Sequence, residues 1–269
     1  MTAEQRWALV TGASRRTGAH LARTLAAHGY HLHLHSNASA SDVLERALSR
    51  EHGIRVIAHH YDLTDTSSID RWAHELANGP YPPRLVVNNA SVFPEPHAVN
   101  DTAALQESLA VHLLAPAALT AALLPGGGHI VNLLDARLRS WDAIRPGYEL
   151  AKHALAAHTR LAAKQLAPRV RVNAIAPGLL LPPPGKDQAH LDGLARQRSP
   201  MGVPARLEDV ASALLFLEKA VSITGEIIHV DGGEHLGPKA GAQRLTAWQT
   251  ESTTSPDAGL TSHKRQGQL

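Results

Sequence analysis

Short apolar segments alternate along this chain with longer segments whose apolar residues recur at helical spacing. The apolar segments have the length and composition of buried strands: Trp7–Val10, Tyr30–His35, Ile54–Tyr61, Leu85–Asn88, His129–Leu134, Val170–Ala176 and Glu226–Val230. The helical segments lie between them: Leu21–Ala27, about Ser41–Glu51, Ser67–Leu76, roughly Thr102–Leu123, Tyr148 to about Leu166, and Leu207–Leu217. Because such alternation favours parallel strands joined by right-handed crossovers, we predict a central parallel sheet with helices on both faces.

The predicted architecture is a single doubly wound, Rossmann-like α/β domain. No internal repeat or change in composition divides residues 1–236, so we assign that range to one domain. After about Gly237 the chain becomes rich in Ser, Thr, Gln, Gly and Lys and loses its hydrophobic periodicity. We expect residues 237–269 to form a flexible tail or an arm that is ordered only in an oligomer.

Composition restricts the classes of function. Hydrophobic residues make up 43% of the 269 residues, enough for a large core, and the formal net charge is only +2. The arginines are scattered without interleaved aromatic residues, so we do not expect a nucleic-acid-binding surface. The chain has no cysteine, which excludes disulfides, a thiolate nucleophile and thiolate metal ligands. The polar segment Met1–Arg6 resembles neither a signal peptide nor a membrane span, and we expect a cytoplasmic protein.

The turn after the first predicted strand is rich in glycine, since Thr11–Gly18 reads TGASRRTG. Gly12 allows a tight turn and lets the backbone approach a pyrophosphate, and Gly18 allows close contact between helix and strand. The N-terminus of the following helix offers unpaired N–H groups to an anion. The spacing differs from the GxGxxG fingerprint, and an ordinary strand–helix connection is the alternative.

Cofactor specificity can be read at the end of the second predicted strand. An acidic residue normally binds the 2′-hydroxyl of NAD there, whereas the 2′-phosphate of NADP prefers cations and hydroxyl groups. This chain has His35-Ser36-Asn37 at that place, with no carboxylate, and Arg15 and Arg16 lie in the glycine-rich turn. These residues favour NADPH as the cofactor, and the alternative is that the two arginines are merely solvated surface residues.

Three histidines of the second predicted strand, His31, His33 and His35, alternate and therefore lie on one face. Such a row can mimic a metal site. Zinc, however, requires ligands that converge in tetrahedral geometry, usually from more than one element. We therefore predict no metal site.

Tyr148 and Lys152 are four residues apart, so on a helix they lie on one face, one turn from each other. A tyrosine phenol titrates near pH ~10 and exchanges protons poorly at neutral pH. A lysine ammonium one turn away stabilises the phenolate and lowers that pKa toward the working range. The pair suits proton transfer to a reduced heteroatom, although two such residues on one solvated helix face also occur by chance.

Four stretches, taken in this order, resemble the short-chain dehydrogenase/reductase family. They are TGASRRTG, the NNAS of Asn88–Ser91, the YELAK of Tyr148–Lys152, and the run from RVNAIAPG (Arg171–Gly178) to ITGEIIHVDGG. The resemblance extends from Trp7 to about Leu236 and rests on the ordered set rather than on any single stretch.

The resemblance implies roles for the residues that match the family's motifs. Asp62 resembles the residue that contacts the adenine, and Asn89 and Ala90 resemble the turn that lines the adenosine ribose. Tyr148 would be the proton donor, and Lys152 would hold the nicotinamide ribose and lower the pKa of the tyrosine. The implied cofactor-binding residues are Gly12, Ser14, Arg15, Arg16, Gly18, His35, Ser36, Asn37, Asp62, Leu63, Asn89, Ala90, Tyr148, Lys152, and Pro177 and Gly178 beside the nicotinamide.

The chain departs from the common family pattern at three positions. Asp135 stands thirteen residues before Tyr148, where most members carry a serine. Arg16 replaces a Gly or Ala of the glycine motif, and His112 replaces an asparagine of the long central helix. A defective site is one explanation. The other is a subfamily, because pteridine reductases resemble this chain at Arg16 and Asp135, and dihydromonapterin reductases resemble it at His112.

Pterin chemistry accounts for these departures. Hydride addition to a C=N bond of the pterin ring requires protonation of a ring nitrogen, and Asp135 beside the tyrosine could relay or donate that proton, or bind ring N–H groups. Phe93 matches the family's aromatic residue that stacks on the pterin. Ser91 and Arg16 would bind the pterin edge and the cofactor phosphates. The simpler alternatives are that Phe93 packs a loop and that Asp135 caps a turn.

We therefore predict NADPH-dependent reduction of a pterin or dihydropteridine, with Asp135, Tyr148 and Lys152 as the catalytic residues. Dihydrofolate is a second candidate substrate. The implied substrate-binding residues are Arg16, Ser91, Phe93, Asp135 and Tyr148. The alternatives are a reductase of small carbonyls or 3-oxoacyl thioesters, and a catalytically weak NADP-binding sensory protein.

Two further expectations concern the substrate loop and the assembly. Residues 179–204 correspond to the family's variable substrate loop, and Pro182–Pro184 predict a stiff, extended entry without a helix. The resemblance also implies a homotetramer that forms through the long central helix and the Tyr148 helix.

Overall fold

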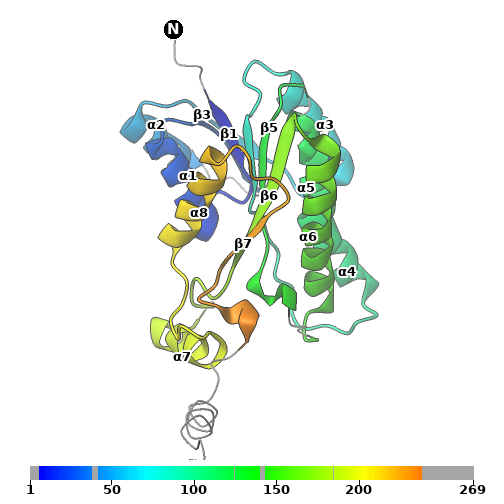
Figure 1. The fold of residues 1–269 in the computed structure, drawn as a ribbon. Coiled ribbons are helices and arrows are strands. Elements are labelled where there is room, and N and C mark those ends of the chain that lie inside the picture. The colour runs from blue at the N-terminus through cyan, green and yellow to red at the C-terminus, as the bar shows by residue number, and fades with distance from the viewer. Residues whose placement is uncertain (1–5, 38–41, 124, 140–142, 184, 238–269) are drawn as a thin grey trace, which may run out of the picture.

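A sheet of seven parallel strands forms the centre of the molecule (Figure 1). The computed structural model describes residues 6–37, 42–123, 125–139, 143–183 and 185–237. The strands are β1 (Trp7–Val10), β2 (His31–Ser36), β3 (Val56–His60), β4 (Leu85–Asn88), β5 (Gly128–Leu133), β6 (Val170–Pro177) and β7 (Ile227–Val230). Their order across the sheet is β3-β2-β1-β4-β5-β6-β7, so the chain reverses its direction of winding after β3. The predicted doubly wound α/β fold is confirmed.

Helices cover both faces of the sheet (Figure 1). One layer consists of α1 (Arg16–Ala27), α2 (Asp42–His52) and α8 (Leu207–Lys219). The other consists of α3 (Thr66–Asn78), α4 (Thr102–Leu109), α5 (Ala115–Leu119) and α6 (Pro146–Leu166). Successive residues of β1 point to opposite faces, so Ala8 and Val10 pack against the first layer and Leu9 packs against the second. Both faces of the sheet are therefore buried, as parallel strands require.

The predicted long helix over Thr102–Leu123 is a continuous helical run with a change of winding. It consists of α4, a π-helical turn η2 (Ala110–Leu114), α5 and a 3₁₀ turn η3 (Thr120–Leu123). Pro116 has no N–H and cannot donate to the carbonyl of His112 four residues earlier. The N–H of Ala115 instead bonds to the carbonyl of Ala110, five residues back. Proline thus accounts for the π turn, and the π turn places His112 toward α6.

The substrate loop contains a helix that the sequence analysis does not predict. It is α7 (Gln188–Arg198), which lies at the carboxyl end of the sheet below α8 in Figure 1. Asp187 caps it by accepting a hydrogen bond from the N–H of His190 at 2.9 Å, and Leu191 and Ala195 are buried one turn apart. Assigning no helix to this loop is therefore wrong beyond its proline-rich entry, because the cap and an apolar pair follow the prolines. Of the predicted tail, only Gly237 lies within the described residues.

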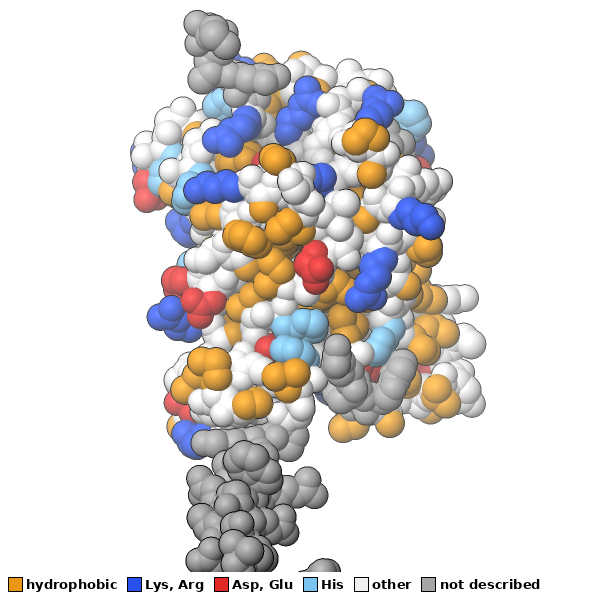
Figure 2. All heavy atoms as spheres, viewed as in Figure 1, with side chains coloured by type: hydrophobic (Ala, Val, Ile, Leu, Met, Phe, Trp, Pro, Cys, Tyr) orange, Lys and Arg blue, Asp and Glu red, His pale blue; other side chains and the backbone are white. Residues whose placement is uncertain are grey.

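Hydrophobic side chains also occur on the surface. Figure 2 shows them gathered on the face formed by α8 and β7. The exposed hydrophobic residues of the described chain include Phe216 of α8 and Val221, two residues after that helix. None of the helices that the structure describes is long and apolar enough to cross a membrane.

The three histidines of β2 make hydrogen bonds within the protein. His31 Nδ1 accepts a hydrogen bond from the backbone N–H of Arg55 at 2.9 Å, and His35 Nε2 donates one to the carbonyl of Tyr61 at 3.0 Å. His33 bonds to a histidine of β3 and to a backbone carbonyl. Within the described residues, no group of three or more His, Cys, Asp or Glu side chains could hold a metal ion.

His33 and His59 belong to a chain of neutral hydrogen bonds. His33 Nε2 lies 2.8 Å from the carbonyl of Tyr81 and its Nδ1 lies 2.9 Å from His59 Nε2, while Trp72 Nε1 donates to His59 Nδ1 at 3.1 Å. Each ring nitrogen has a fixed role, which leaves no acceptor for an added proton. Burial lowers the pKa of His59 to about 3 and that of His35 to about 4.

These pKa values predict a loss of stability in mild acid. The unfolded chain binds protons at its histidines below pH ~6.5, whereas the folded chain does not until the pH approaches 4, so stability is retained above pH ~6.5 and lost below it. Each such histidine contributes up to about 1.4 kcal/mol per pH unit. Urea unfolding between neutral and acidic pH measures this dependence. We expect His59→Gln to flatten it and His74→Gln, on the exposed face of α3, to leave it unchanged; equal slopes in both variants would contradict this origin.

Candidate active site

Asp135 and Tyr148 meet at the carboxyl end of the sheet. Asp135 follows β5 by two residues, and Tyr148 lies in the first turn of α6, where Pro146 occupies a position that does not require an N–H. The Tyr148 hydroxyl donates a hydrogen bond to Asp135 Oδ2 at 2.9 Å. The two residues that the family resemblance connects are thus in direct contact.

Arg137 holds Asp135 in place from the 3₁₀ turn η4 (Ala136–Arg139). Its Nε and Nη2 donate to Oδ1 and Oδ2 at 3.2 Å each, and its backbone N–H donates to Oδ1 at 2.9 Å. Burial raises the pKa of Asp135, but the charge and hydrogen bonds of Arg137 outweigh burial, and the pKa lies below its ordinary value. Arg137 Nε also lies 3.9 Å from Oε1 of the buried Glu149. Asp135 is therefore an ionised hydrogen-bond acceptor.

The surroundings of Tyr148 act on its pKa in the opposite direction from the one the sequence predicts. Burial, and then the Asp135 carboxylate, raise the pKa of the Tyr148 phenol well above its ordinary value. The expectation of a lowered pKa is wrong for this structure, because Asp135 bonds directly to the hydroxyl whereas Lys152 Nζ lies 5.7 Å from the ring centroid, and the net effect is an increase. Tyr148 therefore holds its proton firmly.

Lys152 lies beneath the tyrosine, one turn along α6. It is buried, and its ammonium donates a hydrogen bond to the carbonyl of Leu133, the last residue of β5, at 2.8 Å. Burial lowers the pKa of Lys152 to about 8, and Asp135 partly opposes this effect. The ammonium group is thus fixed in position by the strand that also leads to Asp135.

Phe93 packs edge-on against Tyr148, with ring centroids 5.1 Å apart and an interplanar angle of 82°. The Arg145 guanidinium lies 4.4 Å from the centroid of Phe93 and its Nε donates to the carbonyl of Pro94 at 2.7 Å. Phe93 is nevertheless 56% exposed. A large aromatic surface therefore remains open next to the tyrosine, which is what a flat ligand requires.

His112 approaches Tyr148 from the π turn, with ring centroids 5.2 Å apart and nearly perpendicular planes. Its Nε2 lies 3.0 Å from Ser91 Oγ and its Nδ1 lies 3.0 Å from the carbonyl oxygen of Ser108. Asp135, Phe93, Ser91 and His112 thus gather around one tyrosine, although they come from two separate loops and the π turn.

The glycine-rich turn has the shape that a dinucleotide needs. Gly12 has a φ of +63°, and a Cβ added there would lie 2.8 Å from the Cα of Ala90. A Cβ added at Gly18 would collide with the carbonyl oxygen of Gly12. Asn89 Nδ2 donates to the carbonyls of Thr11 and Gly12 at 2.9 and 3.2 Å, which braces the turn.

The N-terminus of α1 is open to an anion. Its cap residue Arg15 makes no side-chain capping hydrogen bond, and the first turn contains no acidic residue. Arg15 and Arg16 are both exposed, and Ser14 is half-buried. Arg16 has a φ of +52°, in the left-handed region that favours glycine. The donors and charges fit a pyrophosphate or a phosphate group.

The end of β2 differs in part from the prediction. His35 is buried, and its Nδ1 accepts a hydrogen bond from the backbone N–H of Gly12 at 3.4 Å. Its imidazole therefore supports the glycine turn from inside the protein, and contact of His35 with a cofactor stays a prediction. Ser36 Oγ lies 3.2 Å from Nδ1 of the exposed His60, a residue the sequence analysis does not single out, and Asn37 is exposed.

The other predicted cofactor-binding residues lie at the same end of the sheet. Asp62 is exposed and accepts hydrogen bonds from the N–H and Oγ1 of Thr64 at 2.9 and 2.7 Å, and Leu63 is buried. Ala90 N–H donates to Thr11 Oγ1 at 3.0 Å. Pro177 ends β6, and the N–H of Gly178 donates to the carbonyl of Val230 at 3.0 Å.

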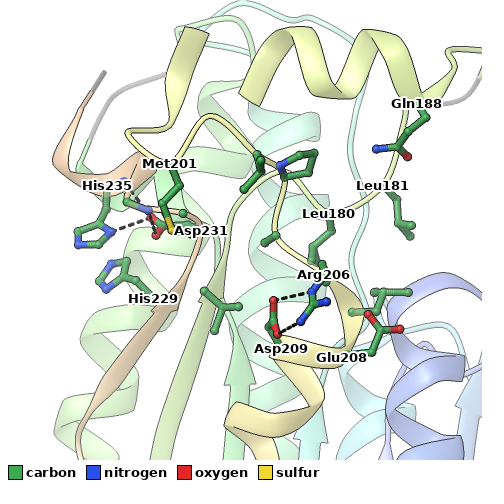
Figure 3. Close-up of a pocket in the computed structure, with 17 residues that line it drawn as sticks. Leu180, Leu181, Gln188, Met201, Arg206, Glu208, Asp209, His229, Asp231 and His235 are labelled. Atoms are coloured by element: carbon green, nitrogen blue, oxygen red, sulfur yellow. Dashed lines mark hydrogen bonds and ion pairs between the residues drawn. The ribbon is translucent and has the colours of Figure 1, made fainter. Parts of the chain in front are cut away.

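A cavity of about 880 Å³ opens beside this end of the sheet (Figure 3). Its walls come from the segment after β6, from β7 and from the start of α8, and they include the Arg206–Asp209 ion pair and the His235–Asp231 pair, whose Nδ1 and Oδ2 are 2.7 Å apart. Among its lining residues there is no Asp135, Tyr148 or Lys152. The proton-transfer residues therefore lie outside the lining of this cavity.

Glu234 connects the substrate loop to the catalytic end of the sheet. It lies in the 3₁₀ turn η5 (Glu234–Leu236) and forms an ion pair with Arg198 at the end of α7. Burial raises the pKa of Glu234, Arg198 opposes this, and the nearby Asp135 carboxylate adds to the increase. The sequence analysis misses Glu234 and Arg137. Spacing gives no signal for Glu234, whereas the position of Arg137, two residues after Asp135, could have indicated a partner for that carboxylate.

Comparison with known proteins agrees with this geometry. The model of a protein family described as enoyl-(acyl carrier protein) reductase matches residues 12–235. The chain belongs to the short-chain dehydrogenase/reductase family. The match covers the glycine-rich turn, the Tyr148 helix and β7, so every predicted site residue lies within it.

Three relatives in this family are informative. The structure of FolM alternative dihydrofolate reductase 1 from Brucella canis, complexed with NADP, superposes on this chain with a TM-score of 0.78 and 32% sequence identity. The match covers 86% of this chain and 94% of the Brucella chain. Dihydromonapterin reductase from Klebsiella pneumoniae is 31% identical over 57% of this chain and 67% of its own length. The 3-oxoacyl-[acyl-carrier-protein] reductase FabG from Aquifex aeolicus is 28% identical over 84% of this chain and 95% of its own length.

The close contact between Gly18 and the carbonyl of Gly12 can be tested by substitution. Gly18→Ala places a methyl group against the carbonyl of Gly12, so the turn must shift, and we expect a loss of about 1–3 kcal/mol in the free energy of unfolding. Gly193→Ala in α7 is the control, since an added Cβ meets only the end of Arg196 at 3.9 Å and a helical alanine stabilises by up to about 1 kcal/mol. Urea unfolding followed by circular dichroism distinguishes them; an unchanged Gly18→Ala variant would show that the turn does not need glycine.

Proposed function

We propose that this chain is an NADPH-dependent reductase of a pterin or dihydropteridine. The observation that carries the proposal is the hydrogen bond from Tyr148 to an ionised aspartate, Asp135, where a carbonyl reductase of this family would present a serine hydroxyl. A carboxylate binds N–H and NH₂ groups, which a pterin offers and a simple ketone does not. The similarity to the Brucella and Klebsiella reductases supports the same substrate class.

The residues present fit NADPH. The turn of Gly12 and Gly18 and the uncapped start of α1 would hold the pyrophosphate, with Arg15 and Arg16 at hand for the additional phosphate. Lys152 would hold the nicotinamide ribose. When bound, NADPH supplies the hydride that reduces a C=N bond of the pterin ring.

The protein residues manage the proton that accompanies the hydride. Tyr148 keeps its proton in the resting site, because burial and Asp135 raise its pKa, and it releases the proton to the ring nitrogen as that nitrogen becomes a strong base. The Lys152 ammonium then stabilises the phenolate from below. Asp135, held ionised by Arg137, orients the Tyr148 hydroxyl and accepts hydrogen bonds from the pterin edge.

Phe93 would form one wall of the pterin site. Its ring is more than half exposed and lies next to Tyr148, so a flat heterocycle could stack on it. Offset stacking of aromatic rings contributes on the order of 1 kcal/mol beyond the burial of surface. Ser91, on the same loop, would contact the edge of the heterocycle.

Reduction of a small carbonyl or a 3-oxoacyl thioester is the second candidate. The similarity to the Aquifex reductase along most of the chain favours it, as does the Tyr148–Lys152 pair, which serves carbonyl substrates equally well. This function predicts turnover of ketones and indifference to antifolates.

A homotetramer is the assembly that we propose. Helix α6 carries Leu150 and Leu161, which are 42% and 68% exposed, and Leu114 is exposed at the end of the π turn. Apolar residues on two neighbouring helices are typical of a face that packs against a second copy. Light scattering of the purified protein measures the number of copies.

Oxidation of NADPH, followed by its near-ultraviolet absorbance, tests the activity. Dihydrobiopterin, dihydromonapterin, dihydrofolate and a panel of ketones are compared in parallel. We expect oxidation that depends on a pterin and is suppressed by methotrexate, and we expect Tyr148→Phe to lose at least 10³-fold in turnover while still binding NADPH. Activity on ketones alone would overturn the pterin assignment, and normal turnover by Tyr148→Phe would remove the proton donor.

Asp135→Ser separates the two candidate functions. The serine restores the common family residue, so it keeps a hydrogen bond to Tyr148 but removes the carboxylate that binds ring N–H groups. We expect kcat/KM for the pterin to fall by about 10-fold or more relative to kcat/KM for a ketone. The ratio of the two values in wild type and variant is the measurement, and equal losses on both substrates would contradict a specific role for the carboxylate.

A further inference from the structure

The hydrogen bonds of His112 fix the position of its proton. Nδ1 lies 3.0 Å from the carbonyl oxygen of Ser108, and because a carbonyl only accepts, Nδ1 must carry the hydrogen. Burial, and then the charge of Lys152, lower the pKa of His112 well below its ordinary value, so the ring is neutral. A neutral imidazole with a protonated Nδ1 has a lone pair at Nε2.

Ser91 must therefore donate its hydrogen to His112. Its Oγ lies 3.0 Å from His112 Nε2, whereas the carbonyl oxygen of Val92, the competing acceptor, is 3.4 Å away. A hydroxyl has one hydrogen and two lone pairs, and the hydrogen is used inside the protein. Since Ser91 is exposed, its oxygen presents only lone pairs to a ligand.

The other polar wall of the site is also an acceptor. The ion pair with Arg137 keeps Asp135 ionised, and Asp135 already accepts a hydrogen bond from the Tyr148 hydroxyl. The rings of His112 and Phe93 lie 5.2 and 5.1 Å from that of Tyr148, so Ser91 and Asp135 belong to one site. A ligand with hydrogens on its edge satisfies both groups, whereas a ligand with oxygen there faces a lone pair.

We propose that His112 is a positioning residue that makes Ser91 a hydrogen-bond acceptor, so that the site selects heterocycles that present an exocyclic NH₂ group, rather than a carbonyl oxygen, to Ser91. The inference rests on the proposed pterin function and specifies which side donates in the hydrogen bonds at the edge of the ligand: the ligand donates and the protein accepts. A pteridine with an amino group at the edge is accepted, and the same ring with a carbonyl in its place is rejected.

Paired ligands test the selection by binding alone. Pterin and lumazine share one ring system, but the 2-amino group of pterin is a carbonyl in lumazine. Titration into the protein saturated with NADP⁺, followed by the fluorescence of the pteridine, gives both dissociation constants. We expect wild type to bind pterin about 10-fold more tightly than lumazine, and His112→Phe and Ser91→Ala to reduce that ratio toward one.

Two further variants separate positioning from a general loss of structure. His112→Gln can still offer an oxygen to Ser91, so we expect it to recover much of the ratio that His112→Phe loses. His158→Phe makes the same change ten residues beyond Tyr148, about 15 Å along α6, and should leave the ratio at the wild-type value.

The tautomer of His112 is measured in the unmodified protein. Nitrogen NMR of the ¹⁵N-histidine-labelled chain, with the His112 signals assigned from the His112→Gln variant, should show a proton on Nδ1 and a bare Nε2 throughout the neutral range. A proton on Nε2 would overturn the inference, even if His112→Phe failed to fold.

The possible failures are distinct. Wild type that binds neither pteridine would overturn the proposed function and this inference together. Wild type that binds pterin with the same preference over lumazine as His112→Phe and Ser91→Ala would overturn the role of His112 and leave the proposed function standing.

Discussion

The ion pair between Asp135 and Arg137 determines the electrostatics of the catalytic end of this sheet. Burial alone would raise the pKa of the Asp135 carboxyl, and the charge and hydrogen bonds of Arg137 reverse that effect. Held ionised, Asp135 orients the hydroxyl of Tyr148 and raises the pKa of the phenol. The same guanidinium approaches Glu149 and lies 5.9 Å from the ring centroid of Phe93. One charged side chain thus keeps the aspartate ionised and, through it, favours the protonated form of the tyrosine.

The fold brings these groups together through the ends of its strands. Strand β5 leads to Asp135 and supplies the carbonyl that fixes Lys152, while β4 leads to the loop of Ser91 and Phe93. In a doubly wound sheet these ends lie beside the point where the winding reverses, and the glycine turn after β1 lies there as well. Cofactor turn, proton donor and substrate wall are therefore neighbours because parallel strands end at one edge.

The sequence predicts the fold better than it predicts the site. Hydrophobic periodicity locates each strand to within about two residues, and the thirteen-residue register brings Asp135 to Tyr148 as expected. What it misses depends on distances between groups that are remote in the chain. The pKa of Tyr148 follows from a contact across a loop, the imidazole of His35 turns inward to a backbone N–H, and α7 follows a proline-rich entry that conceals its cap.

The π turn at Ala110–Leu114 has a consequence for how such a site can change. Each residue of a helix turns the next by about 100°, so a turn that holds one residue more than an α-turn re-aims every side chain on it without moving the flanking helices far. Pro116, near the start of α5, cannot supply the N–H that a regular α-turn would need at this point. A substitution at position 112 can thus change the side chain that the site presents to a ligand, while the core, the sheet and Tyr148 keep their positions.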